Sequence, residues 1–130
     1  MSSPLNVAAV TSRVIRIPRE LLNRGNKSMF SLLKDSGYFE AHDQITKEAL
    51  QDALLFDRES VHDWLQYSDD KRTTSGLYFK EGVPGTYIIG YFPNTAGNMK
   101  KMIFNNEVIA CATYIKFEIE GIRSGSQELC

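Results

Sequence analysis

Acidic side chains are the residues of this chain whose types and spacing could do chemistry. Residues 35–70 hold ten Asp and Glu and only two basic residues, in a chain of net charge −1. Glu48 and Asp52 are four residues apart, and so are Glu59 and Asp63. On a helix each such pair shares one face, where like charges repel by about 0.2–0.5 kcal/mol. The pattern is typical of a solvated face of two surface helices, or of an anionic docking surface for a basic partner.

A second acidic feature is the adjacent pair Asp69 and Asp70, followed by Lys71 and Arg72. Paired carboxylates with basic neighbours can hold a metal ion for phosphoryl chemistry. Consecutive side chains point in different directions, however, and a helix end followed by a turn explains the same run. We therefore treat the two as an extension of the acidic surface. The predicted partner-binding residues are Glu48, Asp52, Glu59, Asp63, Asp69 and Asp70.

Histidine, cysteine and glycine patterns indicate no catalytic chemistry. His42 and His62 have no partner at metal-ligand spacing. Cys111 lies in an apolar helical pattern and is expected to be a core residue, without the exposure a nucleophile needs. The sequence has no phosphate-binding glycine loop, GxSxG or HExxH motif. We expect a protein that is not an enzyme and that uses no cofactor and no metal.

Hydrophobic periodicity predicts the elements that position these residues. Residues 5–17 alternate loosely, and residues 14–17 have a strand-like period of two just before Pro18, which favours an extended conformation at Ile17. A short helix should start at Pro18, and another should run from Lys27 to a stop at Gly37. The acidic residues then fall on an αα-hairpin. Its helices should be capped by Asp43 and Asp57, and Trp64 should be buried on the apolar stripe of the second helix.

After residue 76 the hydrophobic pattern changes from helical spacing to that of β-strands. Residues 77–79 and 86–92 flank a turn-rich loop and predict a β-hairpin, to which residues 102–104 could add a strand. Residues 106–122 have helical spacing with Asn105 or Asn106 as the cap, although KFEIEGI near the end also alternates like a strand. The predicted fold class is α+β, with N-terminal helices packed on a small antiparallel β-sheet and a C-terminal helix. We expect one globular domain over residues 1–123 and a flexible tail over residues 124–130.

Composition narrows the class of protein. With 130 residues and 42% hydrophobic residues the chain can build one core. No apolar stretch of about 18 residues occurs, so no membrane span is expected. The first ten residues do not look like a secretory signal. Cys111 and Cys130 lie in different settings and should not pair, which favours a cytoplasmic location. The near-neutral charge argues against a general nucleic-acid binder, which would carry a clear excess of basic residues.

Two stretches carry a resemblance to a known group of proteins. Residues 64–79 (WLQYSDDKRTTSGLYF) and 87–93 (YIIGYFP) resemble small immunity proteins of bacterial contact-dependent growth inhibition and related polymorphic toxin systems. The resemblance covers the layout of residues 38–120. It implies a cytosolic antitoxin that binds one cognate toxin domain, usually a nuclease, and blocks its active site or the approach of its substrate. No functional residue transfers, because contact residues in these families are specific to each pair.

The charge pattern favours the same function independently. A nuclease holds a polyanion and tends to present a basic cleft, and an acidic surface can occupy such a cleft with electrostatic steering. The leading hypothesis is therefore an immunity protein whose partner is a toxin domain. The oligomeric state stays open.

Two alternatives remain. A small nucleic-acid-associated or regulatory protein could use a basic N-terminal arm, formed by Arg13, Arg16, Arg19, Arg24 and Lys27. A small enzyme could place Asp69, Asp70 and Lys71 near an aromatic pocket. Aromatic residues of the hairpin could stack bases, or could pack a helix onto the sheet. They are Tyr78, Phe79, Tyr87, Tyr91 and Phe92.

Overall fold

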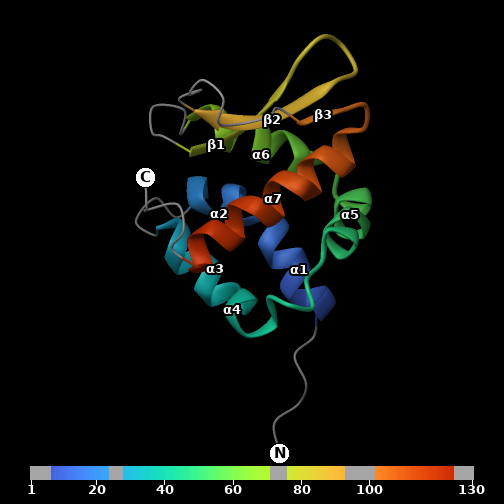
Figure 1. Cartoon of the computed structure of the whole chain (residues 1–130). Coiled ribbons are helices and arrows are strands. Elements are labelled where there is room, and N and C mark those ends of the chain that lie inside the picture. The colour runs from blue at the N-terminus through green and yellow to red at the C-terminus, as the bar shows by residue number, and fades with distance from the viewer. Residues whose placement is uncertain (1–6, 24–27, 71–75, 93–101, 125–130) are drawn as a thin grey trace, which may run out of the picture.

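The structure, a computed structural model, describes residues 7–23, 28–70, 76–92 and 102–124. These residues form helices and one antiparallel sheet, which confirms the predicted α+β class (Figure 1). The elements are, in chain order, α1 (Val7–Ile15), α2 (Ile17–Asn23), α3 (Met29–Ser36), α4 (Tyr38–Ala41), α5 (Lys47–Phe56), α6 (Glu59–Asp70), β1 (Gly76–Glu81), β2 (Tyr87–Phe92), β3 (Met102–Phe104) and α7 (Glu107–Ser124).

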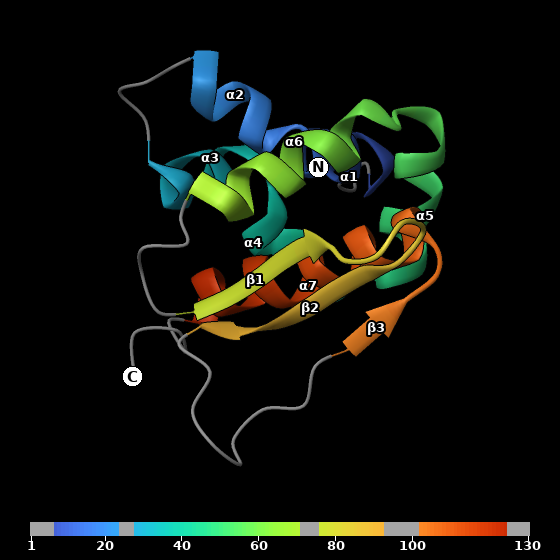
Figure 2. The ribbon, with the colours of Figure 1, turned by 90° about the horizontal axis from the view of Figure 1, so that it is seen from above.

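The sheet has the order β1-β2-β3 with both pairings antiparallel, and it lies on α7, with α6 packed against β1 (Figures 1 and 2). Helices α1 to α5 lie on the side of α7 away from the sheet. Of these helices, α5 makes the most extensive contact with α7. Phe79 of β1 is buried, and its ring stacks on Tyr114 of α7 with 5.3 Å between centroids. Phe79 therefore packs a helix onto the sheet; the side chains of Tyr91 and Phe92 lie outside the described part.

Helix α7 is the central element. The Asn106 side-chain oxygen accepts hydrogen bonds from the backbone N–H of Val108 (2.8 Å) and Ile109 (3.0 Å), as expected of an N-cap. Residues 116–122, which could have been a strand, are helical because the sheet covers one side of α7 and helices cover another. Ser124 ends the helix, and residues 125–130 of the expected tail lie outside the described residues.

The strand-like stretch predicted just before Pro18 is wrong. Residues 7–15 form α1, and Ile17 begins α2. Val10 and Val14 repeat at helical spacing and are buried among α3, α4 and α5. The β-branched residues suggested a strand, but burial of one helical face outweighs their weak propensity. Thr11 fits the helix because its hydroxyl donates to the Val7 carbonyl at 2.6 Å.

Some of the helix caps predicted from the sequence are confirmed, and others are wrong. Gly37 ends α3 with a φ of 95°, a left-handed conformation that glycine adopts without a Cβ clash. The predicted cap Asp43 is wrong, since Thr46 caps α5 by accepting from the Ala49 backbone N–H at 3.1 Å. Asp57 precedes α6 as expected and its carbonyl accepts from the Ser60 N–H, but its carboxylate binds arginines instead.

Trp64 is fully buried, as the sequence predicts. Its indole N–H donates to the Ile15 carbonyl at 2.9 Å, which ties α6 to the end of α1. The ring also makes edge contacts with Tyr67 and Tyr114, at centroid distances of 5.4 and 6.0 Å. These contacts make Trp64 a structural residue.

A polar cluster ties α4 to α7. The buried Tyr38 donates its hydroxyl hydrogen to Glu120, and Lys116 donates to the Tyr38 hydroxyl and to the His42 carbonyl, both at 2.9 Å. Arg123 donates two hydrogen bonds to the Glu120 carboxylate, at 2.9 and 3.1 Å. The hydrogen bonds from Arg123 outweigh the opposing effect of burial and, with that from Tyr38, lower the pKa of Glu120 to about 2.

We expect this cluster to lose its stabilising effect in acid. Because the folded-state pKa of Glu120 lies below its ordinary value of 4.5, the carboxylate stabilises the fold above about pH 4.5 and stops doing so as the pH falls towards 2. Urea unfolding between pH 7 and 2.5 should therefore show a shallower loss of stability in Glu120→Gln than in wild type. The matched control is Glu48→Gln, an exposed glutamate. Equal slopes in wild type and Glu120→Gln would contradict the assignment.

Candidate partner-binding site

Among the residues that the structure describes, three of the six predicted carboxylates are exposed and have no partner. Glu48 and Asp52 lie on one face of α5, and Glu59 lies in the first turn of α6. No hydrogen bond or ion pair to any described residue involves their carboxylates, and none of the three is buried. Helix α5 points Glu48 and Asp52 outward because Leu50 and Leu54 hold its opposite face in the core. The charge of these three residues is therefore free to attract a basic partner.

Asp63, also a predicted partner-binding residue, differs from these three because it pairs with Arg19. Its carboxylate lies 2.8 Å from the terminal nitrogen of Arg19, which also donates through Nε at 3.0 Å. Only 24% of the Asp63 side chain is exposed. Asp63 therefore holds α6 against α2, and sequence reasoning missed this because the two residues are 44 positions apart.

Asp57 has the same role beside it. Arg16 donates to its carboxylate at 3.0 Å, and Arg19 approaches it to 3.5 Å. Burial by itself would raise the pKa of Asp57, but the hydrogen bonds and charges of Arg16 and Arg19 hold that pKa below its ordinary value. Part of the positive N-terminal segment thus neutralises part of the acidic segment inside the fold.

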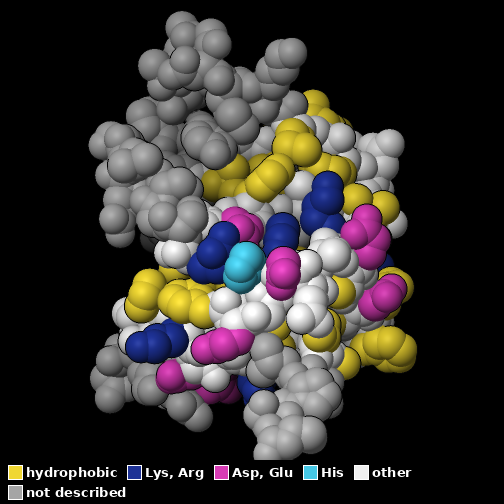
Figure 3. Space-filling view, turned by 60° about the horizontal axis from the view of Figure 1, so that its bottom comes forward, with side chains coloured by type: hydrophobic (Ala, Val, Ile, Leu, Met, Phe, Trp, Pro, Cys, Tyr) yellow, Lys and Arg dark blue, Asp and Glu magenta, His cyan; other side chains and the backbone are white. Residues whose placement is uncertain are grey.

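These ion pairs involve two residues of the basic N-terminal arm predicted from the sequence. Arg16 and Arg19 are engaged by Asp57 and Asp63, and Arg13 donates to the Ser36 carbonyl at 3.5 Å. Arg24 and Lys27 lie outside the described residues. On the face shown in Figure 3, basic and acidic side chains are interspersed and neither sign forms a separate field. The described arginines therefore serve the fold and do not form a free arm.

The Asp69–Asp70–Lys71 cluster is only partly visible. Asp69 is exposed in the last turn of α6, and Asp70 is the last residue of that helix. The side chain of Asp70 and all of Lys71 lie outside the described part. Among the residues that are described, no three His, Cys, Asp or Glu side chains gather as a metal site would require.

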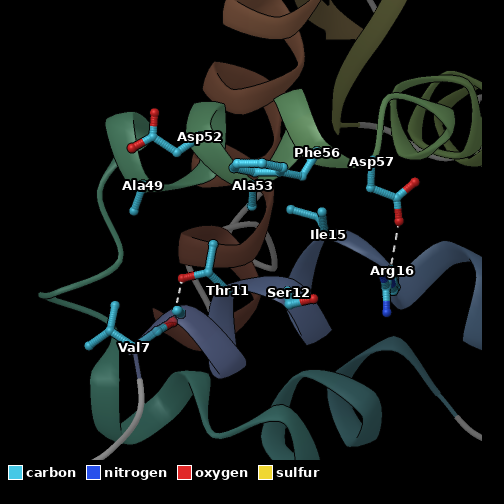
Figure 4. Close-up of a pocket in the computed structure, with 11 residues that line it drawn as sticks. Val7, Thr11, Ser12, Ile15, Arg16, Ala49, Asp52, Ala53, Phe56 and Asp57 are labelled. Carbon is cyan, nitrogen blue, oxygen red and sulfur yellow. Dashed lines mark hydrogen bonds and ion pairs between the residues drawn. The ribbon is translucent and has the colours of Figure 1, made fainter.

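An open groove between α1 and α5 is a feature that the sequence did not predict. Its volume is about 390 Å³. Small side chains on both helices leave this space, and they include Ala8 of α1. Ala49 and Ala53 lie on the α5 wall, and Ile15 points into the space between the helices (Figure 4). The residues that line it are Val7, Ala8, Thr11, Ser12, Ile15, Arg16, Ala49, Asp52, Ala53, Phe56 and Asp57.

Two large apolar residues are exposed at the end of α5, and one of them, Phe56, lines the groove. Phe56 is 93% exposed and Leu55 is 55% exposed. Residues 55 and 56 both lie outside the apolar stripe of α5, which ends with Leu54. Their position in the sequence could therefore have predicted that they are exposed. Exposed aromatic side chains next to a pocket are typical of protein-binding surfaces. We call Glu48, Asp52, Leu55, Phe56 and Glu59 the α5 surface.

Comparison with known proteins adds no relative. No family model matches the chain, and no curated protein or solved structure matches it either. Within the described part of the chain, every helix is too short or too polar to cross a lipid bilayer. The function therefore has to be inferred from the chemistry of the α5 surface.

Proposed function

We propose that this protein is an immunity protein that binds and neutralises a cognate bacterial toxin domain, a nuclease. One observation carries the proposal: Glu48 and Asp52, which have no partner among the described residues, share α5 with the exposed Leu55 and Phe56. A surface of this kind offers both long-range attraction and an apolar anchor. Buried aromatic anchors surrounded by polar groups supply most of the affinity in protein interfaces.

The electrostatic part explains why a nuclease fits. A nuclease cleft must attract phosphates, so it carries Lys and Arg side chains. Glu48, Asp52 and Glu59 would meet those cations, and the approach would be steered by opposite charge. The resemblance of residues 64–79 and 87–93 to toxin-immunity proteins supports the same partner class. The ion pairs of Arg16 and Arg19 weigh against the nucleic-acid alternative.

Neutralisation in cells tests the proposal. A toxin domain encoded directly upstream of this gene should stop growth when it is expressed alone, and co-expression of this protein should restore growth. The variant Glu48→Lys/Asp52→Lys/Phe56→Ala should lose most of the protection, because it removes charge and anchor together. The control Glu81→Lys reverses an exposed carboxylate on the β-hairpin and should protect like wild type. Failure to bind or neutralise the toxin domains encoded next to this gene would contradict the proposal.

A further inference from the structure

We propose that the groove between α1 and α5 receives one apolar side chain from a helix of the partner protein, with a Lys or Arg one turn away that pairs with Asp52. This inference deepens the proposed function, on which it rests, by naming the chemistry of the partner segment. Ala8, Ala49, Ala53 and Ile15 give the groove apolar walls. A volume of about 390 Å³ leaves ample room for one Leu, Met or Phe side chain.

The charged residues around the groove indicate which sign of charge its occupant should carry. Three charged residues line it, and two of them, Arg16 and Asp57, bind each other at 3.0 Å. The third, Asp52, is exposed and has no hydrogen bond or ion pair with a described residue. Figure 4 places its carboxylate at the rim, directed away from α1. The groove therefore combines apolar walls with one uncompensated negative charge, which is complementary to an apolar segment that carries a cation.

The same charges argue against a second copy of this chain as the occupant. In a twofold dimer through this groove, Asp52 of both protomers would lie in one interface, with Glu48 of both nearby. Like charges placed opposite each other across an interface disfavour the wrong partner. A basic partner brings the opposite sign and removes that repulsion.

Phe56 completes the site. The ring is 93% exposed and borders the groove, so a helix that enters the groove would cover it. Covering an exposed aromatic ring next to a filled pocket is typical of an interface hot spot. We expect Phe56→Ala to weaken binding by about tenfold or more.

The probe for this inference is a synthetic helical peptide that carries one Leu and, one turn away on the same face, one Lys. Titrated into ¹⁵N-labelled protein, it should shift the backbone amides of Ala8, Ser12, Ala53 and Phe56. A peptide with Glu in place of Lys should bind at least about tenfold more weakly. Ala53→Leu, which fills the groove, should weaken binding of the Lys peptide, while Gln66→Leu on the exposed side of α6 should not. Phe56→Ala serves as the second variant, should Ala53→Leu disturb the fold.

Several outcomes would overturn the inference. Peptide shifts confined to the sheet, or binding that Ala53→Leu and Phe56→Ala leave unchanged, would place the docking site elsewhere. A dimer seen by sedimentation and dissolved by Phe56→Ala would make the second copy the occupant. Full toxin neutralisation by both groove variants would reject the groove but keep the proposed function. Peptide binding in the groove without neutralisation of a toxin would keep the groove and reject the proposed function.

Discussion

Trp64→Ala is expected to lower the free energy of unfolding by about 3–5 kcal/mol. The side chain is fully buried, so its removal leaves a large cavity between α6, α1 and α7. The substitution also leaves the Ile15 carbonyl without the indole N–H that it accepts at 2.9 Å. An unpaired buried carbonyl adds a penalty to that of the cavity.

Urea unfolding followed by far-ultraviolet circular dichroism measures this loss. Trp64→Phe is the matched control, because it keeps an aromatic ring and removes the N–H and part of the volume. Its loss should be clearly smaller than that of Trp64→Ala. A loss below about 1 kcal/mol in Trp64→Ala would show that the ring is not part of the core, since cavities of this size cost more.

Glu48→Lys/Asp52→Lys is expected to slow association with the cognate toxin domain by about tenfold or more at low ionic strength. Both carboxylates are exposed and unpaired among the described residues, so reversal changes the field that a basic partner meets. Steering acts on the association rate and weakens as salt screens it, with a Debye length of about 10 Å at 0.1 M. Stability should change by no more than about 0.5 kcal/mol.

Stopped-flow binding at two ionic strengths measures this effect, and the double variant should also lose most of the salt dependence. Glu48→Lys alone is compared with Glu81→Lys, which makes the same change on the hairpin and should bind like wild type. Asp63 is left out of the variant because Asp63→Lys would place a cation against Arg19 and disturb the fold. Unchanged association of the double variant at low salt would contradict electrostatic docking.

The two kinds of contact on the α5 surface should be separable by kinetics. Charge reversal at Glu48 and Asp52 acts before contact, on the association rate. Truncation of Phe56 removes a contact made only in the complex, so it should act mainly on the dissociation rate. An interface built only from charge would show no such difference.

Sequence reasoning succeeded where the signal is local. Gly37 and Asn106 are caps whose neighbours lie within a few residues, and the apolar spacing around Trp64 identifies a buried helical face. It failed at α1, where β-branched residues favour a strand until the burial of Val10 and Val14 decides for a helix. The sequence also favoured Asp43 over Thr46, because Asp is the commoner N-cap residue of the two.

The sequence by itself determined that a strongly acidic helical segment would lie between a basic segment and a small sheet. Only the tertiary structure decided which of those carboxylates are free. Asp63 is neutralised by Arg19 from 44 residues away, whereas Glu48 and Asp52, of the same type and in the same pattern, have no such partner among the described residues. The groove likewise forms only when α1 and α5 pack together. Charge counts and periodicity depend only on a residue's type and on its neighbours in the sequence. Ion pairs and cavities depend on which segments, distant in the sequence, come into contact.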